Sequence, residues 1–397
     1  MPSSLAIDGG TPVRGKLLPY GKQCVDEEDI AAVTEVLRSD WLTTGPKVEE
    51  FEKAFAAFVG AAEAVAVSNG TAAVHAALHA LHIGPGDEVI LPAMTFAATA
   101  NAIVFCGGKP VFADCDPETL LLDPKSVEAA FTERTKAVIT VDYAGQPSDY
   151  DALRAVTDRR HVPLVSDACH ALGGLDKGRT IGSIADLNTF SFHPVKPMTT
   201  GEGGMITTHD HHFAKAMREF RNHCLTSDHR ERHNAGTWFY EMSDLGYNYR
   251  LTDIQCALGI SQLKHIPAWT ARRQEIAAEY DSAFSDLPQL TPVAKRSDVS
   301  HAYHLYVIRL QPKKLRVSRD EVFKALRAEN IGVNVHYIPV HLHPYYQEHH
   351  GTKPGMCPHA EEAYRHIISL PMFAGMTNLD ANDVVEAVRK VLKAYAS

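Results

Sequence analysis

Several features that mark special classes of protein are missing from this chain of 397 residues. No window approaches the roughly 20 consecutive apolar residues that a membrane-spanning helix requires, and the first residues lack the apolar core of a signal peptide. Lys and Arg form no block, and the formal net charge is −9, so the electric field would repel nucleic-acid backbones. We therefore expect a cytoplasmic protein whose partners include neither a membrane nor a nucleic acid.

Cysteine is also scarce. The seven cysteines are odd in number and scattered, and no two of them form a C-x-x-C pair. A secreted disulfide framework or a zinc ribbon needs paired or closely spaced cysteines. We therefore expect reduced thiols and no structural zinc. The other proportions, 45% hydrophobic and 22% charged residues, are those of an ordinary globular protein with a large core.

Short apolar runs alternate with helical stretches from residue 63 onward. The runs are AVAVS, DEVILP, KPVFAD, KAVITVDY and PLVSD, and segments such as TAAVHAALHAL separate them. Repeated strand–helix units predict an α/β fold with a mostly parallel sheet covered on both faces. After Asp167 two strand-like runs, LNTFSF and GGMITTH, follow one another with only a loop between them. We therefore expect the connectivity of the sheet to change there.

Helices are predicted on both sides of this pattern. Residues 26–60 are expected to form two helices, the first capped by Asp26 and the second closed by Gly60, with the polar connector SDWLTTGP between them. From about residue 261 a long helical stretch, kinked or broken at Pro267, leads away from the sheet.

This stretch divides the chain into two predicted domains. Residues 1–260 form an N-terminal unit with the sheet, and residues 261–397 a smaller C-terminal α+β domain. The smaller domain is expected to contain strands in AYHLYVIRL and IGVNVHY, a helix opened by a capping box at Ser318 and Glu321, and a terminal helix capped near Thr377.

Ligands of open α/β sheets gather where the strands end. After AVAV, Gly70 and Thr71 offer free backbone N–H groups at a helix start, which suits a phosphate, although such residues are more often only a cap. After PLVS, Asp167 ends a buried strand and needs a cationic partner or several donors, unless it serves only as a loop cap. Lys196 lies among apolar residues, two prolines and a glycine cluster. Most lysines are solvated surface charges, but a stiff apolar loop favours Schiff-base chemistry.

Five motifs occur in one order along the chain: SNGTAA, PAMTFAATAN, SDACHALGG, FSFHPVKPMTTGEGG and YNYRLTDIQCALG. In this order they resemble the DegT/DnrJ/EryC-type sugar aminotransferases, which depend on pyridoxal phosphate. The resemblance extends from about Leu18 to the C-terminus. It implies the fold type I of pyridoxal-phosphate-dependent transferases (aspartate aminotransferase-like), with a mostly parallel mixed sheet in the large domain. It also implies a homodimer with shared active sites.

By this resemblance Lys196 forms the Schiff base with pyridoxal phosphate, and Asp167 pairs with the pyridine nitrogen. Lys196 would also act as the general base, and pyridoxamine phosphate would be the intermediate form of the cofactor. The other cofactor contacts that the resemblance implies are Gly70, Thr71 and Ser191 at the phosphate, Phe96 on the ring, His170 near the phenolic oxygen, and Asn248, which reaches the neighbouring subunit. Taken alone, Phe96 is more often a core residue and Asn248 a turn residue.

The segments VNVHYIPVHLHPYY and HIISLPMF make the chain most similar, within this family, to the aminotransferases of pseudaminic acid synthesis. Those enzymes move the amino group of L-glutamate to C4 of a UDP-4-keto-6-deoxy-N-acetylhexosamine. Aromatic residues offer flat faces that suit a uracil ring or a hexose. The substrate contacts that this similarity implies are Tyr20, Asp40, Trp41, Leu42, Thr43, His336, Tyr337, Ile338 and Pro339.

Alternatives remain open at this point. An aminotransferase for another nucleotide-linked keto sugar, GDP- or dTDP-linked and aminated at C4 or C3, would share every cofactor residue. A sugar dehydratase of the same fold carries His in place of Lys196, and a noncatalytic cofactor-binding regulator would lack Lys196 or Asp167 or carry a DNA-binding segment. No metal is expected at His336, His341 and His343, because prolines interrupt the segment and no Cys or carboxylate lies close by in the sequence.

Overall fold

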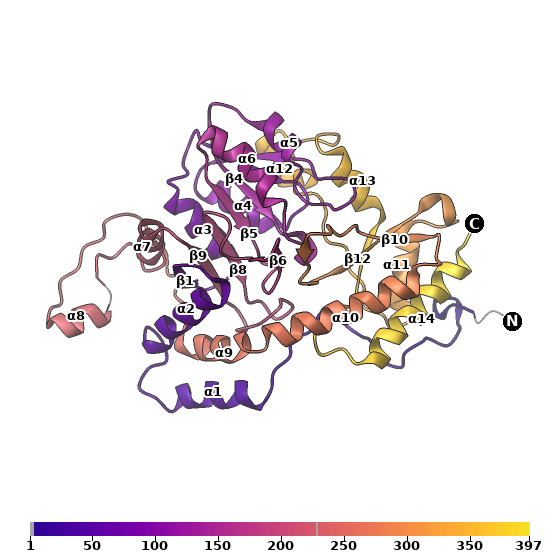
Figure 1. The fold of residues 1–397 in the computed structure, drawn as a ribbon, viewed down its shortest axis with the longest axis horizontal. Coiled ribbons are helices and arrows are strands. Elements are labelled where there is room, and N and C mark those ends of the chain that lie inside the picture. The colour runs from indigo at the N-terminus through magenta and orange to yellow at the C-terminus, as the bar shows by residue number, and fades with distance from the viewer. Residues whose placement is uncertain (1–3, 228) are drawn as a thin grey trace.

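The computed structural model describes residues 4–227 and 229–397 (Figure 1). Its central sheet has seven strands in the order β1–β9–β8–β5–β4–β2–β3. These strands are Glu63–Val67 (β1), Glu88–Pro92 (β2), Lys109–Ala113 (β3), Thr135–Val141 (β4), Leu164–Asp167 (β5), Leu187–Ser191 (β8) and Gly204–Thr208 (β9). The five strands from β8 to β3 pair in parallel, whereas β9 is antiparallel to both of its neighbours. The predicted mostly parallel sheet and the change after Asp167 are both confirmed.

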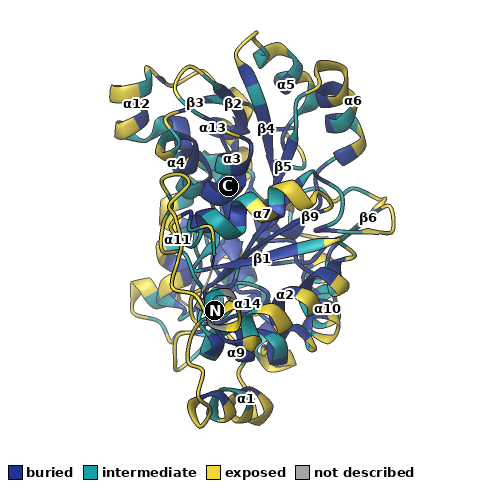
Figure 2. Cartoon of the chain, turned by 90° about the vertical axis from the view of Figure 1, so that its left-hand side faces the viewer, coloured by how far each residue is buried: buried dark blue, intermediate teal, exposed yellow. Residues whose placement is uncertain are grey.

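Helices cover both faces of this sheet. They are Glu27–Leu37 (α1), Pro46–Val59 (α2), Gly70–Ala80 (α3), Ala97–Phe105 (α4), Pro124–Ala130 (α5), Tyr150–Arg160 (α6), His211–Phe220 (α7) and Asp253–Leu263 (α9). Strand β1 shows how the layers form: Val65 and Val67 belong to a core shared with residues of α3, α4 and α7, whereas Ala64 and Ala66 belong to a core shared with residues of α2, α6 and α9. Side chains alternate across a strand, so each strand contributes to two cores. The strands are accordingly buried in Figure 2.

The C-terminal part has its own antiparallel sheet of Leu290–Pro292 (β10), Tyr306–Leu310 (β12) and Ile367–Leu370 (β13). The helices Ile266–Phe284 (α10), Arg319–Ala328 (α11) and Asn378–Ala394 (α14) pack on this sheet and form a third hydrophobic core. Leu5 and Leu18, from the other end of the chain, are buried in the same core. The helices Pro344–His350 (α12) and Pro358–His366 (α13) instead pack into the core of the large sheet, through Tyr346 and Ala360.

Short elements complete the described chain. They are Ala6–Asp8 (η1), Tyr143–Gly145 (η2), Leu175–Asp176 (β6), Arg179–Thr180 (β7), His229–Ala235 (α8), Val299–Ser300 (β11), Pro312–Lys314 (η3) and Val340–Leu342 (η4). None of the helices within the described ranges is both long and apolar enough to cross a membrane.

Most of the expected helix boundaries are confirmed. Asp26 and Thr377 cap α1 and α14 with their side chains, and Gly60 closes α2 in a left-handed conformation. The Ser318 capping box opens α11. Pro267 lies in the first turn of α10, directly after the break that separates it from α9. Proline lacks the N–H that a helix interior needs, so a first turn suits it.

The predicted strand IGVNVHY is wrong. This segment is extended, but it forms only isolated bridges, from Ile331 to Leu18 and from Asn334 to Ser369. Its first residues pair with the N-terminal segment and its later ones with β13, so no continuous ladder forms with either neighbour. The segment is therefore rich in strand-forming residues because it is buried between the N-terminal segment and β13.

Candidate active site

Gly70 opens α3 where β1 ends, and it lies against the ends of two neighbouring strands. The side chain of Asn69 caps the helix by accepting a hydrogen bond from the N–H of Ala72 at 2.8 Å. A Cβ atom on Gly70 would lie 2.8 Å from Cβ of Ser191 and 3.5 Å from Sγ of Cys169, so only glycine permits this approach. The helix start, with half-buried Gly70 and Thr71, therefore faces Ser191. Such a helix start can bind a phosphate.

Asp167 is a buried carboxylate at the end of β5. Its Oδ2 accepts a hydrogen bond from Oγ1 of Thr99 at 2.7 Å, and its Oδ1 accepts one from the N–H of Cys169 at 3.2 Å. Within the described part of the chain, no Lys, Arg or His forms an ion pair with it. A buried charge of this kind needs a cationic partner, so the site can receive a positively charged group from a ligand.

Lys196 lies in the loop between β8 and β9 and is half-buried. Burial lowers the pKa of Lys196, while the nearby Cys169 and Asp167 act in the opposite direction. No carboxylate pairs directly with the ammonium group among the residues described. A lysine with a lowered pKa reaches the uncharged form that acts as nucleophile or base more easily than a solvated one.

The loop around Lys196 is held by one hydrogen bond within it and by others from outside it. Within the loop, Oγ1 of Thr199 donates to the carbonyl of Phe192 at 2.9 Å; from outside, Oε1 of Gln262 accepts from the N–H of Thr199 at 3.2 Å. Nη2 of the buried Arg273 donates to the carbonyl of Pro197 at 3.4 Å. These bonds connect the loop to α9 and α10, so the lysine is held on a fixed backbone.

His170 lies three residues after Asp167 and is buried. Its Nε2 is 3.0 Å from the hydroxyl of Tyr337, while its Nδ1 is buried and has no hydrogen-bond partner. Burial, with the positive charge of Lys196, holds the pKa of His170 well below its usual range. The imidazole is therefore neutral, with one ring nitrogen available to a ligand.

Phe96 differs from a core residue in being 59% exposed. It precedes the first turn of α4, and its ring centroid lies 6.0 Å from that of Tyr337. An exposed aromatic ring beside Tyr337 and His170 is free to stack on a planar ligand. The core-packing explanation of Phe96 is thereby excluded.

The predicted substrate residues from the two ends of the chain meet at this place. The ring of Tyr20 lies 5.3 Å from that of His336, whose Nδ1 is 2.8 Å from Oγ of Ser369. Ile338 is exposed, whereas Pro339 is buried. The segment of residues 336–339 therefore contacts both Tyr20 and, through Tyr337, the cofactor-side residue His170.

Two groups of predicted site residues lie elsewhere. The connector residues Asp40–Thr43 are exposed and are attached through a bridge from Thr43 to Thr252. Asn248 is exposed in a segment that forms a bridge with Asn222. Neither group contacts Lys196 or Asp167 of the same described chain.

The histidines of the segment VNVHYIPVHLH do not converge on a common point. His336 contacts Ser369, whereas Nε2 of the buried His341 is 2.9 Å from Oε1 of Glu361. No carboxylate lies close to these histidines in the sequence, but the fold brings Glu361 of α13 to His341. A single histidine and carboxylate do not make a metal site.

Three side chains of the site were missed by the sequence analysis: Thr99, Cys169 and His304. Thr99 and Cys169 lie inside motifs already singled out, and Thr99 is one helical turn from Thr95, whose hydroxyl is 2.8 Å from its own. His304 is buried with its ring 4.3 Å from that of His170. It comes from a distant part of the chain, so no local pattern reveals it.

Together these groups fit pyridoxal phosphate. The helix start at Gly70 suits its phosphate, the carboxylate of Asp167 its protonated pyridine nitrogen, and the amine of Lys196 its aldehyde. The free Nδ1 of His170 and the exposed ring of Phe96 offer a polar and a stacking contact to the same ring.

Comparison with known proteins agrees with this geometry. The model of the DegT/DnrJ/EryC1/StrS aminotransferase family matches residues 23–389. The spore coat polysaccharide biosynthesis protein SpsC of Bacillus subtilis is 46% identical over 382 residues, which are 96% of this chain and 98% of that protein.

Solved structures are similar over nearly the whole chain. Spr1654 from Streptococcus pneumoniae, in its PMP form, has a TM-score of 0.90 at 33% identity and covers 95% of this chain and 99% of its own. A PLP form of the same protein has a TM-score of 0.89. PseC from Helicobacter pylori, an aminotransferase involved in the biosynthesis of pseudoaminic acid, has a TM-score of 0.89 at 32% identity, with 96% of this chain and 100% of that one covered.

The family model spans almost the full length, and these relatives exceed 30% identity over nearly all of it. The chain therefore belongs to the DegT/DnrJ/EryC1/StrS aminotransferase family and is a sugar aminotransferase that depends on pyridoxal phosphate.

Proposed function

We propose that this enzyme transfers the amino group of L-glutamate to C4 of a UDP-4-keto-6-deoxy-N-acetylhexosamine. The observation that carries the proposal is the contact of the 336–339 segment, through Tyr337, with His170 beside the lysine. This segment belongs to the part of the sequence that is most similar to pseudaminic acid aminotransferases. The similarity to PseC over nearly the whole chain supports the same substrate class.

In this proposal the cofactor is held by residues at the strand ends. Gly70, Thr71 and Ser191 bind the phosphate, and Asp167 binds the pyridine nitrogen. Pyridoxal phosphate, when bound, supplies an electron sink that makes the hydrogen on Cα of an amino acid acidic. His170 directs its free Nδ1 to the phenolic oxygen, and Phe96 covers the ring.

Lys196 is the proposed catalytic base. Its Nζ takes the proton from Cα of glutamate in the first half-reaction and delivers a proton to C4 of the sugar in the second. The lowered pKa of Lys196 favours this exchange, because a base works best when its pKa is near the working pH.

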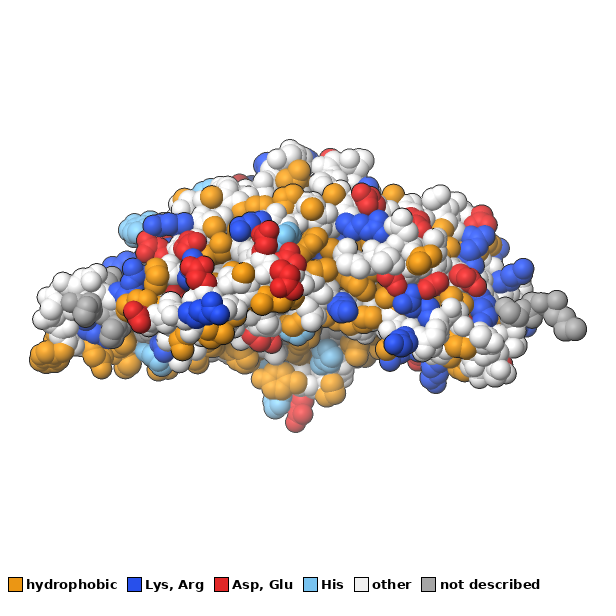
Figure 3. All heavy atoms as spheres, turned by 90° about the horizontal axis from the view of Figure 1, so that it is seen from below, with side chains coloured by type: hydrophobic (Ala, Val, Ile, Leu, Met, Phe, Trp, Pro, Cys, Tyr) orange, Lys and Arg blue, Asp and Glu red, His pale blue; other side chains and the backbone are white. Residues whose placement is uncertain are grey.

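We propose that a second copy of the chain completes the site. Asn248 and the connector Asp40–Thr43 are exposed and contact neither Lys196 nor Asp167 of their own described chain. The arm that precedes Asn248 projects from the large sheet and carries exposed apolar side chains, among them Trp238, Phe239, Met242 and Leu245 (Figures 1 and 3). Large exposed apolar patches mark interaction surfaces, which supports a homodimer with shared sites.

The higher identity to SpsC favours a second candidate. At 46%, this identity exceeds the 32% found for PseC, and SpsC is named for spore coat polysaccharide biosynthesis. A different nucleotide-linked keto sugar, GDP- or dTDP-linked, would use the same cofactor residues and differ only at the outer contacts.

Absorbance spectroscopy of the purified holoenzyme separates these candidates. We expect L-glutamate to bleach the band of the lysine-bound cofactor and a UDP-4-keto-6-deoxy-N-acetylhexosamine to restore it. If only a GDP- or dTDP-linked keto sugar restores the band, the proposed substrate is overturned, but the assignment of the chain as an aminotransferase is unaffected. If glutamate fails to bleach the band, the proposal that L-glutamate is the amino donor is overturned.

The role of Lys196 is tested by replacing it. We expect Lys196→Ala to abolish turnover but still to bind pyridoxal phosphate noncovalently, because the phosphate and pyridine contacts remain. Equilibrium dialysis measures the retained cofactor, and product formation measures turnover. Measurable turnover in this variant would contradict the proposed base.

A further inference from the structure

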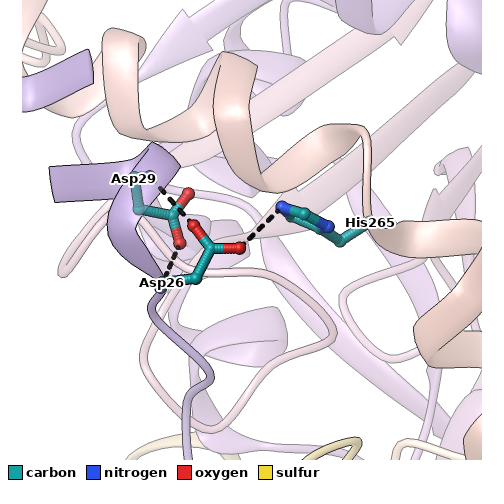
Figure 4. A group of neighbouring side chains, drawn as sticks. All are labelled: Asp26, Asp29 and His265. Carbon is teal, nitrogen blue, oxygen red and sulfur yellow. Dashed lines mark hydrogen bonds and ion pairs between the residues drawn. The ribbon is translucent and has the colours of Figure 1, made fainter. Parts of the chain in front are cut away.

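Asp26, Asp29 and His265 form a cluster outside the active site (Figure 4). Asp26 and Asp29 belong to the first turn of α1, and His265 lies in the turn between α9 and α10. Each residue offers one ligand atom, and these atoms all lie within 4.8 Å of one another. Among the described residues, this is the one such group of three.

The hydrogen bonds of the helix cap use only one oxygen of each of the two carboxylates. Oδ1 of Asp26 accepts from the N–H groups of Glu28 and Asp29, at 2.9 and 3.0 Å. Oδ2 of Asp29 accepts from the N–H of Asp26 at 3.1 Å. One oxygen of each residue therefore remains for another partner.

The remaining oxygen of Asp26 lies beside the imidazole. Oδ2 of Asp26 is 3.2 Å from Nε2 of His265, which makes this ion-pair contact but no hydrogen bond. Asp29 is only 1% exposed, and its Oδ1 is buried without any hydrogen-bond partner. An unpartnered buried carboxylate oxygen is costly, and a helix cap does not account for it.

A neighbouring amide fixes the orientation of the buried carboxylate. Nε2 of Gln262 donates to Oδ2 of Asp29 at 2.5 Å, and Oε1 of the same amide accepts from the N–H of Thr199 at 3.2 Å. Outer hydrogen bonds of this kind orient metal ligands. They also connect the cluster to the loop of Lys196. The ring of His265 is held by stacking on Trp269, with centroids 5.1 Å apart.

We propose that Asp26, Asp29 and His265 bind a divalent transition-metal cation, Zn²⁺ being the ion that fits this donor set best. Two carboxylates and one imidazole supply three ligands, and water completes a tetrahedron. Mg²⁺ and Ca²⁺ prefer oxygen ligands alone, so the imidazole selects against them. The partly exposed side chains of Asp26 and His265 give the ion a path from solvent.

The ion fastens the start of α1 to the turn between α9 and α10. Local sequence patterns contain no sign of this site, because its third ligand is far from the other two along the chain. The scattered cysteines predicted no structural zinc, and the proposed site departs from that prediction because it uses no cysteine; the cation here has a structural role.

The test compares Zn²⁺ binding by the holoenzyme and by a His265→Phe variant. Phenylalanine retains the stacking on Trp269 but offers no ligand atom, so the variant is expected to fold. The chain has 22 histidines, and surface ones will bind some Zn²⁺. The measurements are therefore the stoichiometry by isothermal titration calorimetry and the position of Zn²⁺ by anomalous scattering from crystals.

We expect the wild-type enzyme to bind one more Zn²⁺ than His265→Phe and to gain several degrees in Tm that the variant does not gain. The matched control is His366→Phe, which removes a partly exposed histidine 3.1 Å from the single carboxylate of Glu362. This control should retain the extra Zn²⁺ and the gain in Tm.

A second variant, Asp29→Asn, tests the same site if His265→Phe does not fold. It keeps an oxygen that can accept the N–H of Asp26 and should weaken the tight site by about tenfold or more. Equal stoichiometry in wild type and His265→Phe, or anomalous density only at other histidines, would overturn the proposal.

Discussion

The carboxylate of Asp167 is prepared for a cation before any ligand arrives. Two donors, the hydroxyl of Thr99 and the N–H of Cys169, hold its two oxygens. Neither donor carries a charge, so the negative charge is oriented but not neutralised. The hydroxyl of Thr99 in turn contacts that of Thr95 at 2.8 Å. A short chain of hydroxyls, from Thr95 before α4 and Thr99 within it, thus fixes the direction of the carboxylate.

Removal of the Thr99 hydroxyl should destabilise the cofactor-free enzyme. We expect Thr99→Val to lower the free energy of unfolding by about 1–3 kcal/mol, because a buried charged acceptor loses its donor. Urea denaturation followed by fluorescence, at fixed protein concentration, measures the shift. Thr99→Ser keeps the hydroxyl and should stay close to wild type; an equal loss in both variants would assign the effect to the lost methyl group.

A site residue can be proposed from the sequence where it directly follows a strand. Asp167 ends β5 and Gly70 opens the helix after β1, and parallel strands bring such ends together, whereas Ser191 was predicted from the family resemblance. Lys196 is found because its loop is unusual in composition. His304 could not be predicted, because a segment from the C-terminal half brings it to His170.

At the scale of elements, Glu88 ties the beginnings of three strands together. It lies at the start of β2, and its buried carboxylate accepts hydrogen bonds from Lys109 at the start of β3, at 3.1 Å, and from Arg134 just before β4, at 2.6 Å. Thr132 donates to the other oxygen at 2.6 Å. Burial alone would raise the pKa of Glu88, but these bonds lower it from 4.5 to about 2.

This contact predicts an acid-sensitive part of the stability. A carboxylate with a lowered pKa in the folded state stabilises fully above its unfolded pKa of 4.5, and its contribution is lost as the pH falls toward about 2. We expect the Tm of wild type to drop more than that of Glu88→Gln between about pH 5 and about pH 3. Equal drops in calorimetric scans would mean that the carboxylate adds no pH-dependent stability.

The alternation of strands and helices was sufficient to predict strands β1 to β5 of the large sheet, because a helix follows each of β1 to β4 and most residues of these strands are buried. The prediction of a strand in IGVNVHY was wrong, because residues that are typical of strands also occur in an extended segment that lies between two partners. The predicted division of the chain after residue 260 remains a prediction, and α9 runs through that position. No local sequence pattern predicts that α12 and α13 pack on the large sheet.

For the whole molecule, the proposed dimer explains why some residues of the five motifs lie away from the site of Lys196 and Asp167 in the same chain. Asn248 belongs to the motif YNYRLTDIQCALG, yet it is exposed and contacts neither Lys196 nor Asp167. The exposed arm before it, with Trp238 83% exposed, would be an unusual surface for a lone chain. A second copy accounts for both observations.

Mixed dimers test this arrangement. Lys196→Ala and Asn248→Ala should each be impaired alone, but a coexpressed mixture should regain about a quarter of wild-type activity, since half of the dimers carry one intact site of two. Activity per protomer is measured on the mixture of all three dimer species, purified through a tag that both chains share. A mixture no more active than its parents would show that Asn248 does not act across subunits.

The burial of Leu5 and Leu18 against the last helix has a consequence for how the protein is made. The same core includes Val391 and Leu392, which are synthesised much later than these two residues. At about 5–20 residues per second, the first segment waits roughly 20–80 s before its packing surface exists. The segment around Leu5 and Leu18 therefore lacks part of its packing surface until α14 has been synthesised, and the C-terminal core closes only after that.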